Sequence, residues 1–487
     1  MNELLVERLP PIVDIGPERQ LFLDDLLIDS LENAARFVHQ PRKLAENPVF
    51  EMEKPWEGQR FLYCDVVKDR DKGTYNLWYS IYPEVNNPGL CYAVSEDGIH
   101  FERPELGLVE FNGSTANNLL ALPAGFAHDM TVAKDEREQD PARRYKMAYY
   151  YAGGVGMAWS PDGLRWTAHQ PNPVIAPTGD ASQSLFWDQR YGLYVMYLRP
   201  NGHHKKRTWR NRGVPYDASV FPTRRMGRAE SIDAASWTHI EEVLTPDQRD
   251  GPGTEFYYMP VLPYQGAYLG FLNVYHEFTG DSQPLAGTNY TIDAQLTFSR
   301  DGRQWTRVCD RQVFLRGDEQ AWDEKRLYID HVQVEDECIR IYYRGSNIPH
   351  AGINDLLGTQ HNGRLLRGDA LGIAELRVDG FVSIAAGDQP GSLTTRPLRF
   401  DAGNALRLNA DASQGEVRVE VRTLYGAVID GFSLGECLPL NADCTTHEVQ
   451  WRSGRTLAQL KEPVRLHFSL RQSQLYSFQI VAQRGTA

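Results

Sequence analysis

The sequence lacks both an excess of positive charge and any long apolar run. Lys and Arg number 51 against 64 Asp and Glu, so the formal net charge is −13. Because the summed field of such a chain repels phosphate, this balance opposes general binding to nucleic acid or to an anionic membrane. No segment approaches eighteen unbroken apolar residues, so we also expect no membrane-spanning helix.

The start of the chain lacks a secretion signal. The segment "MNELLVERLPPIVDIGPERQ" carries acids and prolines where a signal peptide needs a cationic end followed by an apolar run. We therefore expect a cytoplasmic protein, or a secreted one if a leader has been removed from this sequence.

Cysteine is scarce, and several catalytic motifs are missing. The six cysteines are scattered without a CxxC pair, so free thiols are expected, although Cys437 and Cys444 are close enough in sequence to pair in an exported chain. The absence of HExxH and of a phosphate-cradling Gly-rich loop argues against metalloprotease and nucleotide-dependent chemistry.

Aromatic residues are plentiful, and a short pattern repeats. The 10 Trp, 24 Tyr and 19 Phe are typical of strand-rich proteins and of clefts where rings stack on sugars. The pattern Ser-x-Asp-x-x-x-aromatic occurs at 95–101, 160–166, 231–237 and 299–305, with a degraded fifth copy, "RVDGFVS", at 377–383. Since Asp-Gly favours tight turns, each copy predicts a hairpin at a fixed place in a repeating unit, with a structural role.

Two strand-like runs precede each copy of this box. Examples are "RFLYCDVVKD" and "TYNLWYSIYP" in the first unit and "EFYYMPVLP" and "AYLGFLNVYH" in the fourth. Four strands per unit and five units predict an all-β fold, a five-bladed β-propeller over residues 1–385. We expect the N-terminal strand "RQLFLDDLLID" to complete the last blade. Short alternating strands after the propeller predict a C-terminal β-sandwich at 386–487.

Acidic residues recur in the innermost strands, one per predicted blade: Asp65, Asp129, Asp180, Glu255 and Asp330. Buried acids are costly unless they are paired, metal-bound or functional. Two opposed carboxylates are what glycoside hydrolysis needs, one to protonate the leaving oxygen and one to act as nucleophile or to activate water. Alternatively, these acids cap strands, bind water or hold a structural Ca²⁺ in the channel; beyond that ion, no cofactor is expected.

At these positions the chain resembles the five-bladed glycoside hydrolases of families 32, 43, 62, 68 and 130, and its architecture is closest to family 32. The resemblance implies that Asp65, 10 residues before "YNLWY", is the nucleophile and that Asp129 in "HDMTV" stabilises the transition state. The family's first-blade Asn-Asp-Pro-Asn is "YCDVV" here, and its Glu-Cys acid motif is absent. Glu255 is therefore the first candidate for the proton donor and Asp180 the second.

Other polar residues are candidates for substrate binding. Asp330, His128, His276 and His331 could bond sugar hydroxyls; the histidines could instead ligate a metal or be ordinary polar residues.

The basic run "HHKKRTWRNR" at 203–212 follows the second strand of the third blade, in a loop expected on the funnel face. There Arg207, Arg210, Arg212 and Trp209 could bind an anionic group of the substrate or neutralise the acids, or form a solvated loop.

The leading hypothesis is a glycoside hydrolase with a carbohydrate substrate, and the resemblance favours furanosides of fructose or arabinose. A second hypothesis is a sugar phosphorylase resembling family 130, in which the basic run holds phosphate. A third is a non-catalytic glycan-binding propeller.

Overall fold

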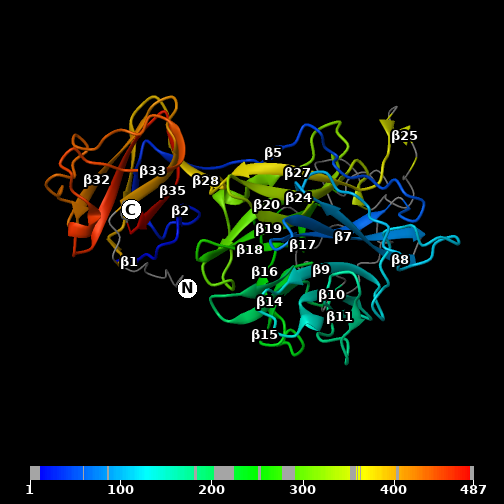
Figure 1. The fold of residues 1–487 in the computed structure, drawn as a ribbon. Coiled ribbons are helices and arrows are strands. Elements are labelled where there is room, and N and C mark those ends of the chain that lie inside the picture. The colour runs from blue at the N-terminus through cyan, green and yellow to red at the C-terminus, as the bar shows by residue number, and fades with distance from the viewer. Residues whose placement is uncertain are drawn as a thin grey trace. The chain divides into compact units, whose positions relative to one another are not determined.

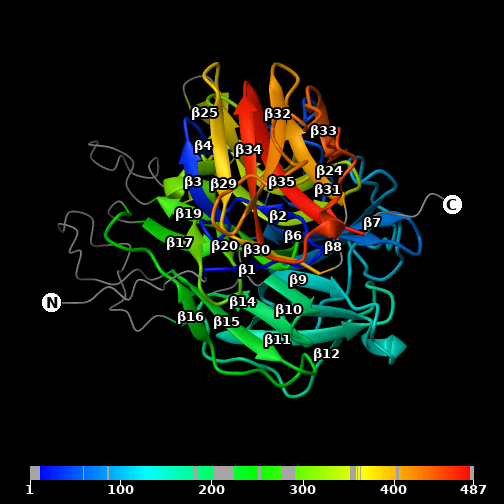
Figure 2. The same cartoon turned by 90° about the vertical axis from the view of Figure 1, so that its left-hand side faces the viewer.

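The protein is described by a computed structural model over residues 11–58, 60–84, 87–179, 184–201, 224–250, 254–276, 291–350, 358, 360–361, 364–401 and 405–482. The chain divides into two compact units. The larger unit comprises 41–307 and 313–375, and the smaller comprises 1–40, 308–312 and 376–487. Figure 1 labels the strands of both units, and Figure 2 shows the same ribbon from a second side.

Strands form nearly all of the regular structure. In the described ranges, helix is limited to three short 3₁₀ turns at Pro141–Arg143, Cys309–Arg311 and Leu457–Gln459. No helix there is long and apolar enough to cross a membrane. The predicted all-β class is confirmed, and the six cysteines are free thiols, as expected.

The strands of the larger unit fall into five successive antiparallel sets, which we call sheets 1 to 5. Sheet 1 contains β6 (Phe61–Asp69), β7 (Thr74–Glu84) and β8 (Asn87–Ser95). Sheet 2 contains β9 (His128–Lys134), β10 (Tyr145–Tyr151), β11 (Gly154–Ser160) and β12 (Thr167–Ala168). Sheet 3 contains β13 (Ser184–Asp188), β14 (Leu193–Leu198), β15 (Met226–Ser231) and β16 (Glu241–Leu244).

Sheets 4 and 5 are joined into one ten-stranded sheet by a single parallel pair, Ile292 with Arg326. Sheet 4 contains β17 (Thr254–Tyr258), β18 (Val261–Tyr264), β19 (Ala267–His276), β20 (Thr291–Ser299), β21 (Thr306–Arg307) and β22 (Val313–Leu315). Sheet 5 contains β23 (Arg326–Val334), β24 (Cys338–Ser346), β27 (Ala370–Arg377) and β5 (Arg42–Lys43). A separate pair is formed by β25 (Gln360–His361) and β26 (Arg364–Leu365). The order of sets along the chain is the one predicted for five blades.

The repeated boxes fix hairpins and link neighbouring sheets. In the first box the Ser95 hydroxyl donates to Asp97 at 2.9 Å and accepts from the Gly98 N–H at 2.9 Å. Boxes two to four repeat the bond from serine to aspartate. In the three boxes that contain a glycine, an aromatic residue of a neighbouring sheet donates to that glycine, as Trp78 Nε1 does to Gly163 O at 2.6 Å. The third box has Ala234 at this position. The boxes are therefore structural, as expected.

A contact of the same kind, from an aromatic residue to a box glycine, joins the last sheet of the larger unit to the first. The Tyr342 hydroxyl of sheet 5 donates to Gly98 O of sheet 1 at 2.8 Å. The first strand of sheet 1, β6, lies against β9 of sheet 2 and also against β23 of sheet 5. Sheet 5 thus returns to sheet 1, as a closed ring of blades requires.

The smaller unit packs two six-stranded sheets face to face. One contains β1 (Val13–Asp14), β30 (Leu398–Arg399), β34 (Val464–Arg471), β29 (Gly391–Thr395), β3 (Ile28–Glu32) and β32 (Glu416–Thr423). The other contains β33 (Asp443–Glu448), β31 (Ala405–Asp411), β35 (Ser473–Val481), β28 (Val382–Ala386), β4 (Ala35–Val38) and β2 (Gln20–Leu21). Both sheets contribute to one apolar core, for example through Phe468 and Phe478, which are fully buried.

The N-terminal segment differs from the prediction. The expected closing strand "RQLFLDDLLID" does not join the last blade, because its apolar residues Phe22 and Leu27 lie in the core of the smaller unit. The pair that completes sheet 5 is formed instead by Arg42 and Lys43 of β5 with β27. The N-terminal 40 residues thus group with the C-terminal strands, and the division lies near 376 rather than at 385.

The degraded fifth box lies in the smaller unit and not in the last blade, where the repeat predicted it. Asp379 belongs to the smaller unit, where its carboxylate accepts from Arg19 Nε at 2.9 Å and from the Ser477 hydroxyl at 2.6 Å. Its role there is to hold the N-terminal segment against the C-terminal strands of that unit.

Candidate functional site

The first strands of four sheets carry a bulge in the same region. Each bulge inserts one extra residue opposite the second strand, and the four inserted residues are Leu62, Asp129, Tyr257 and Asp330. Bulges redirect side chains and are frequent beside active sites. All four of these strands carry carboxylates that the sequence singled out.

Asp129 lies in the bulge at the start of β9, between His128, which pairs with Tyr150, and Met130, which pairs with Tyr149. Its backbone has a φ of 48°, in the left-handed region that few residues other than glycine adopt. Such a conformation costs about 1–3 kcal/mol, so it persists only where the surroundings impose it. The carboxylate is buried and lies 2.8 Å from Nδ1 of His128.

Aromatic side chains surround Asp129. The His128 ring stacks on Tyr150, with 4.8 Å between centroids, and meets the edge of Tyr82. Burial raises the pKa of Tyr63 far above its ordinary value, and the negative charge of Asp129 raises it further. Burial and Asp129 raise the pKa of Tyr82 in the same way. Both phenols therefore keep their protons at neutral pH and can act as hydrogen-bond donors.

Glu255 on β17 forms an ion pair with Arg224. The guanidinium carbon of Arg224 lies 5.4 Å from the ring centre of Tyr257 and 4.9 Å from that of Tyr275. Arg199 approaches the same tyrosine: it donates to the carbonyl of Tyr257 at 2.6 Å and lies over its ring. Two arginines thus accompany the acid of sheet 4.

Two tyrosines connect the acids of sheets 2 and 4. The Tyr63 and Tyr257 hydroxyls are 3.5 Å apart. Tyr63 is close enough to Asp129 to feel its charge, and Tyr257 lies two residues after Glu255 on the same strand. We call the group formed by Tyr63, Asp129, Glu255 and Tyr257 the mouth site, because all four lie toward the starts of the first strands.

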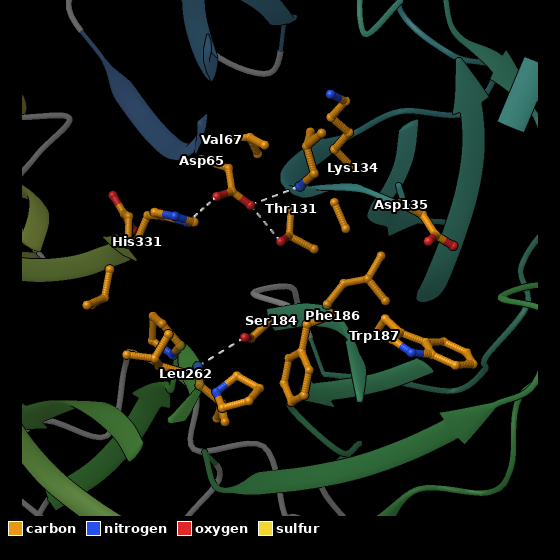
Figure 3. A pocket seen from close by; sticks show the side chains of 18 of the residues that line it. Asp65, Val67, Thr131, Lys134, Asp135, Ser184, Phe186, Trp187, Leu262 and His331 are labelled. Atoms are coloured by element: carbon orange, nitrogen blue, oxygen red, sulfur yellow. Dashed lines mark hydrogen bonds and ion pairs between the residues drawn. The ribbon is translucent and has the colours of Figure 1, made fainter. Parts of the chain in front are cut away.

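Asp65 lies further along its strand, beside the mouth site. One oxygen accepts from the Thr131 hydroxyl at 2.8 Å and from the Val132 N–H at 2.9 Å. The other lies 2.6 Å from Nδ1 of His331, as Figure 3 shows. Thr131 follows Asp129 by two residues, so the carboxylates of Asp65 and Asp129 share one strand as support.

Asp330, predicted to bind substrate, is engaged elsewhere. Its carboxylate forms a two-pronged ion pair with Arg344, and the two side chains are 1% and 4% exposed. The Cys64 thiol also donates to it, at 3.3 Å. Burial raises the pKa of Asp330 to about 6, although Arg344 opposes that rise. The Asp330 side chain is thus held in a buried ion pair, and its contact with substrate stays a prediction.

Of the predicted histidines, His128 and His331 each pair with a predicted carboxylate, Asp129 and Asp65. The third, His276 at the end of β19, pairs through Nε2 with Asp293 at 3.1 Å. Burial lowers the pKa of His276, but the bond to Asp293 outweighs it, so the pKa is raised.

Five predicted site residues lie outside the described residues: Asp180, Arg207, Trp209, Arg210 and Arg212. The strands β14 and β15 do place the basic run between second and third strands of sheet 3, as expected. Arg199 and Arg224, which flank the undescribed segment 202–223, both lie over Tyr257.

Sequence reasoning missed the aromatic and arginine members of the site: Tyr63, Tyr82, Tyr150, Arg199, Arg224, Tyr257 and Tyr275. One usable signal was proximity in sequence, because Tyr63 and Tyr257 each lie two residues from a predicted carboxylate.

A metal ligand set does not occur in the described part of the chain, where no three His, Cys, Asp or Glu side chains lie close enough to hold an ion. The Ca²⁺ in the channel stays a prediction.

No protein-family model matches the chain, and no curated protein matches it. Among solved structures, the chain is similar to a family 32 β-fructofuranosidase from Bombyx mori, with 11% identity and a TM-score of 0.42 over 90% of this chain and 94% of that one. It is also similar to a β-1,2-mannobiose phosphorylase from Listeria innocua, with 12% identity and a TM-score of 0.43 over 70% and 97%. A third is an N-acetylgalactosamine deacetylase from F. plautii, with 16% identity and a TM-score of 0.44 over 72% and 96%.

Proposed function

We propose that this chain is a glycoside hydrolase whose reaction takes place at the mouth site. The observation that carries the proposal is a set of carboxylates on the first strands of three sheets beside one tyrosine pair. Asp129 lies near Tyr63, Glu255 lies two residues before Tyr257, and the two hydroxyls are 3.5 Å apart. Asp65 bonds to Thr131, two residues after Asp129. Glycosidic bonds break through an oxocarbenium-like transition state, which needs one acid for the leaving oxygen and one carboxylate on the other side of the sugar.

Each carboxylate has a distinct role in this proposal. Asp65 is held by three donors and acts as the nucleophile or as the base that activates water. Asp129 stabilises positive charge that develops on the sugar, because a buried carboxylate interacts strongly with a nearby cation. Glu255 donates the proton, and its ion pair with Arg224 must open before it can do so.

The aromatic residues in and around the mouth site suit a sugar. Tyr82, Tyr150 and Tyr275 offer flat rings for the C–H faces, and the protonated phenols of Tyr63 and Tyr82 offer donors to ring hydroxyls. Furanosides of fructose or arabinose are the substrates that the sequence resemblance favours.

Replacement of Asp129 by Asn tests the proposal. Asn adopts the left-handed conformation almost as readily as Asp, so Asp129→Asn keeps the bulge and removes only the charge. The full chain is assayed against aryl furanosides and pyranosides, and we expect kcat to fall by about 10²–10⁴-fold with unchanged thermal unfolding. Asp336→Asn, at the exposed far turn of sheet 5, is the matched control. Full hydrolysis by Asp129→Asn would refute the assignment.

A sugar phosphorylase is the second candidate, and the position of Arg199 and Arg224 at the two ends of the basic segment favours it. Planar guanidinium groups suit bidentate contact with phosphate. Turnover that requires added inorganic phosphate would select the phosphorylase, and hydrolysis in its absence would select the hydrolase. Sugar binding without any turnover would select the non-catalytic alternative.

A further inference from the structure

A cavity lies inside the larger unit, with a volume of about 400 Å³. Figure 3 shows that it is lined by Asp65 and Val67 of β6, Phe186 of β13 and Leu262 of β18. All five sheets contribute, through the first strands β6, β9, β13 and β23 and through β18, which follows the first strand of sheet 4. We call it the rear cavity. Its volume falls in the size range of small-molecule sites.

The rear cavity lies beyond Asp65 as seen from the mouth site. The first strands of sheets 1 and 2 run in the same direction, because Asp65 bonds to Val132 while Asp69, further along, bonds to Lys134. Asp129 precedes this level. The residues that line the cavity lie at this level or follow it, including Val67, Ala133, Lys134, Phe186, Trp187 and Val332. The cavity and the mouth site are therefore on opposite sides of Asp65.

The interior of the rear cavity is mainly apolar. Val67, Phe186, Leu262 and Val332 form the walls. Such walls suit the C–H face of a ring, and Phe186 provides the aromatic surface on which a sugar would stack.

One hydroxyl among the residues that line the cavity has a proton to donate. The Ser184 hydroxyl accepts from Val261 N–H at 3.0 Å, which leaves its proton to bond a ligand. The Asp65 carboxylate also lines the cavity, but its Oδ1 is buried beside Nδ1 of His331, at 2.6 Å. Ser184 therefore offers a donor near the aromatic ring of Phe186.

The charged residues at the rim are neutralised by neighbours. Lys134 pairs with Asp69 at 2.9 Å and with Glu136 at 2.7 Å. Arg137 pairs with Asp135 at 3.1 Å, and its guanidinium carbon lies 3.1 Å from the ring centre of Trp187. An ionic ligand would gain little at this rim, because each charge already has its counterion.

We propose that the rear cavity is a second binding site and that its ligand is a neutral monosaccharide. The ring stacks on Phe186, and one sugar hydroxyl accepts from Ser184. The cavity has room for one sugar ring with some water. This site goes beyond the proposed function, since it binds an intact sugar and breaks no bond.

Titration calorimetry on the full chain tests the proposal. The protein carries Asp129→Asn, so that the mouth site is altered, and the probes are glucose, galactose, fructose and arabinose. We expect at least one to bind with a stoichiometry of about one and millimolar affinity. Adding Phe186→Ala removes the stacking face and should weaken binding at least about fivefold. Adding Val67→Trp fills the cavity and should abolish binding.

The matched control is Leu122→Ala, an exposed leucine away from the cavity, which should leave affinity unchanged. If Val67→Trp does not fold, the comparison of Phe186→Ala with Leu122→Ala decides alone. Absence of binding by all four sugars to folded protein would overturn the proposal. So would tighter binding of methylammonium or glucuronate, because a charged ligand would then fit better than a neutral one. Loss of catalysis in Asp129→Asn leaves this test intact, because it measures binding only.

Discussion

Replacing Arg344 by Leu should destabilise the larger unit strongly. Arg344 and Asp330 are 4% and 1% exposed and share two hydrogen bonds, so the variant leaves the Asp330 carboxylate buried without its cation. Removing one partner of a buried ion pair typically costs about 3–5 kcal/mol. In a unit of this size each 1 kcal/mol lowers the midpoint by about 2 °C, so Arg344→Leu should melt roughly 6–10 °C below the parent.

The double variant Arg344→Leu/Asp330→Leu separates this cause from lost packing. Replacing both partners of a buried pair by apolar residues is often neutral or stabilising, so the double variant should recover most of the loss. Urea unfolding followed by circular dichroism gives the free energies, and a double-mutant cycle gives the coupling. Arg344 also lies 4.7 Å from the ring centre of Tyr63, a member of the mouth site, so this cycle measures stability and not activity.

Two results would refute this reasoning. The first is a double variant as unstable as the single one, which would mean that the pair contributes no buried charge to be compensated. The second is a coupling free energy near zero in the cycle, which would mean that Arg344 and Asp330 do not stabilise each other.

Three further predictions follow from individual contacts. Glu255→Gln should lose turnover of alkyl glycosides while keeping that of nitrophenyl glycosides, because a good leaving group needs no acid; equal losses would exclude Glu255 as proton donor. Tyr342→Phe removes the bond to Gly98 that links sheets 5 and 1 and should cost about 1 kcal/mol in urea unfolding; no change would refute a role in closure. The pKa of His276 is raised in the folded protein, so its protonation contributes stability that is present below about pH 6.5, the ordinary histidine value. This stability is lost as the pH rises through the folded pKa. Asp293→Asn should flatten this pH dependence of the free energy of unfolding, measured from about pH 5 to 9.

Much of the larger unit could be predicted because its strands are long and locally encoded. The run "AYLGFLNVYH" coincides with β19, and "RFLYCDVVKD" differs from β6 by one residue. The N-terminal strands could be recognised as strands, but their partners could not. Leu21 pairs with Ser477 at the other end of the chain, and nothing local distinguishes that partner from the edge of a last blade.

Individual residues of the site could be predicted from their strands, but not all of their partners could. Asp65 and His331, proposed separately, are brought together at 2.6 Å. The ion pair of Asp330 with Arg344 could not be predicted, because a bulge interrupts the regular ladder at Asp330. Ile329 pairs with Tyr343 and His331 with Tyr342, so Asp330 is an extra residue whose side chain follows no alternation. A bulge leaves no reliable mark in a single sequence.

In the larger unit, the contacts that hold the sheets together and the strained residue of the mouth site lie at opposite ends of the strands. Its sheets are held together at the box hairpins, where Trp78, Tyr197 and Tyr342 each donate to a glycine of another sheet's box. The strained residue Asp129 lies at the opposite end of its strand, where no such contact is needed for closure. A strained backbone persists only when the rest of the fold supports it, and here the hairpins supply that support. Conservative changes at the mouth site should therefore reduce activity more than stability, and changes at the hairpins should do the reverse.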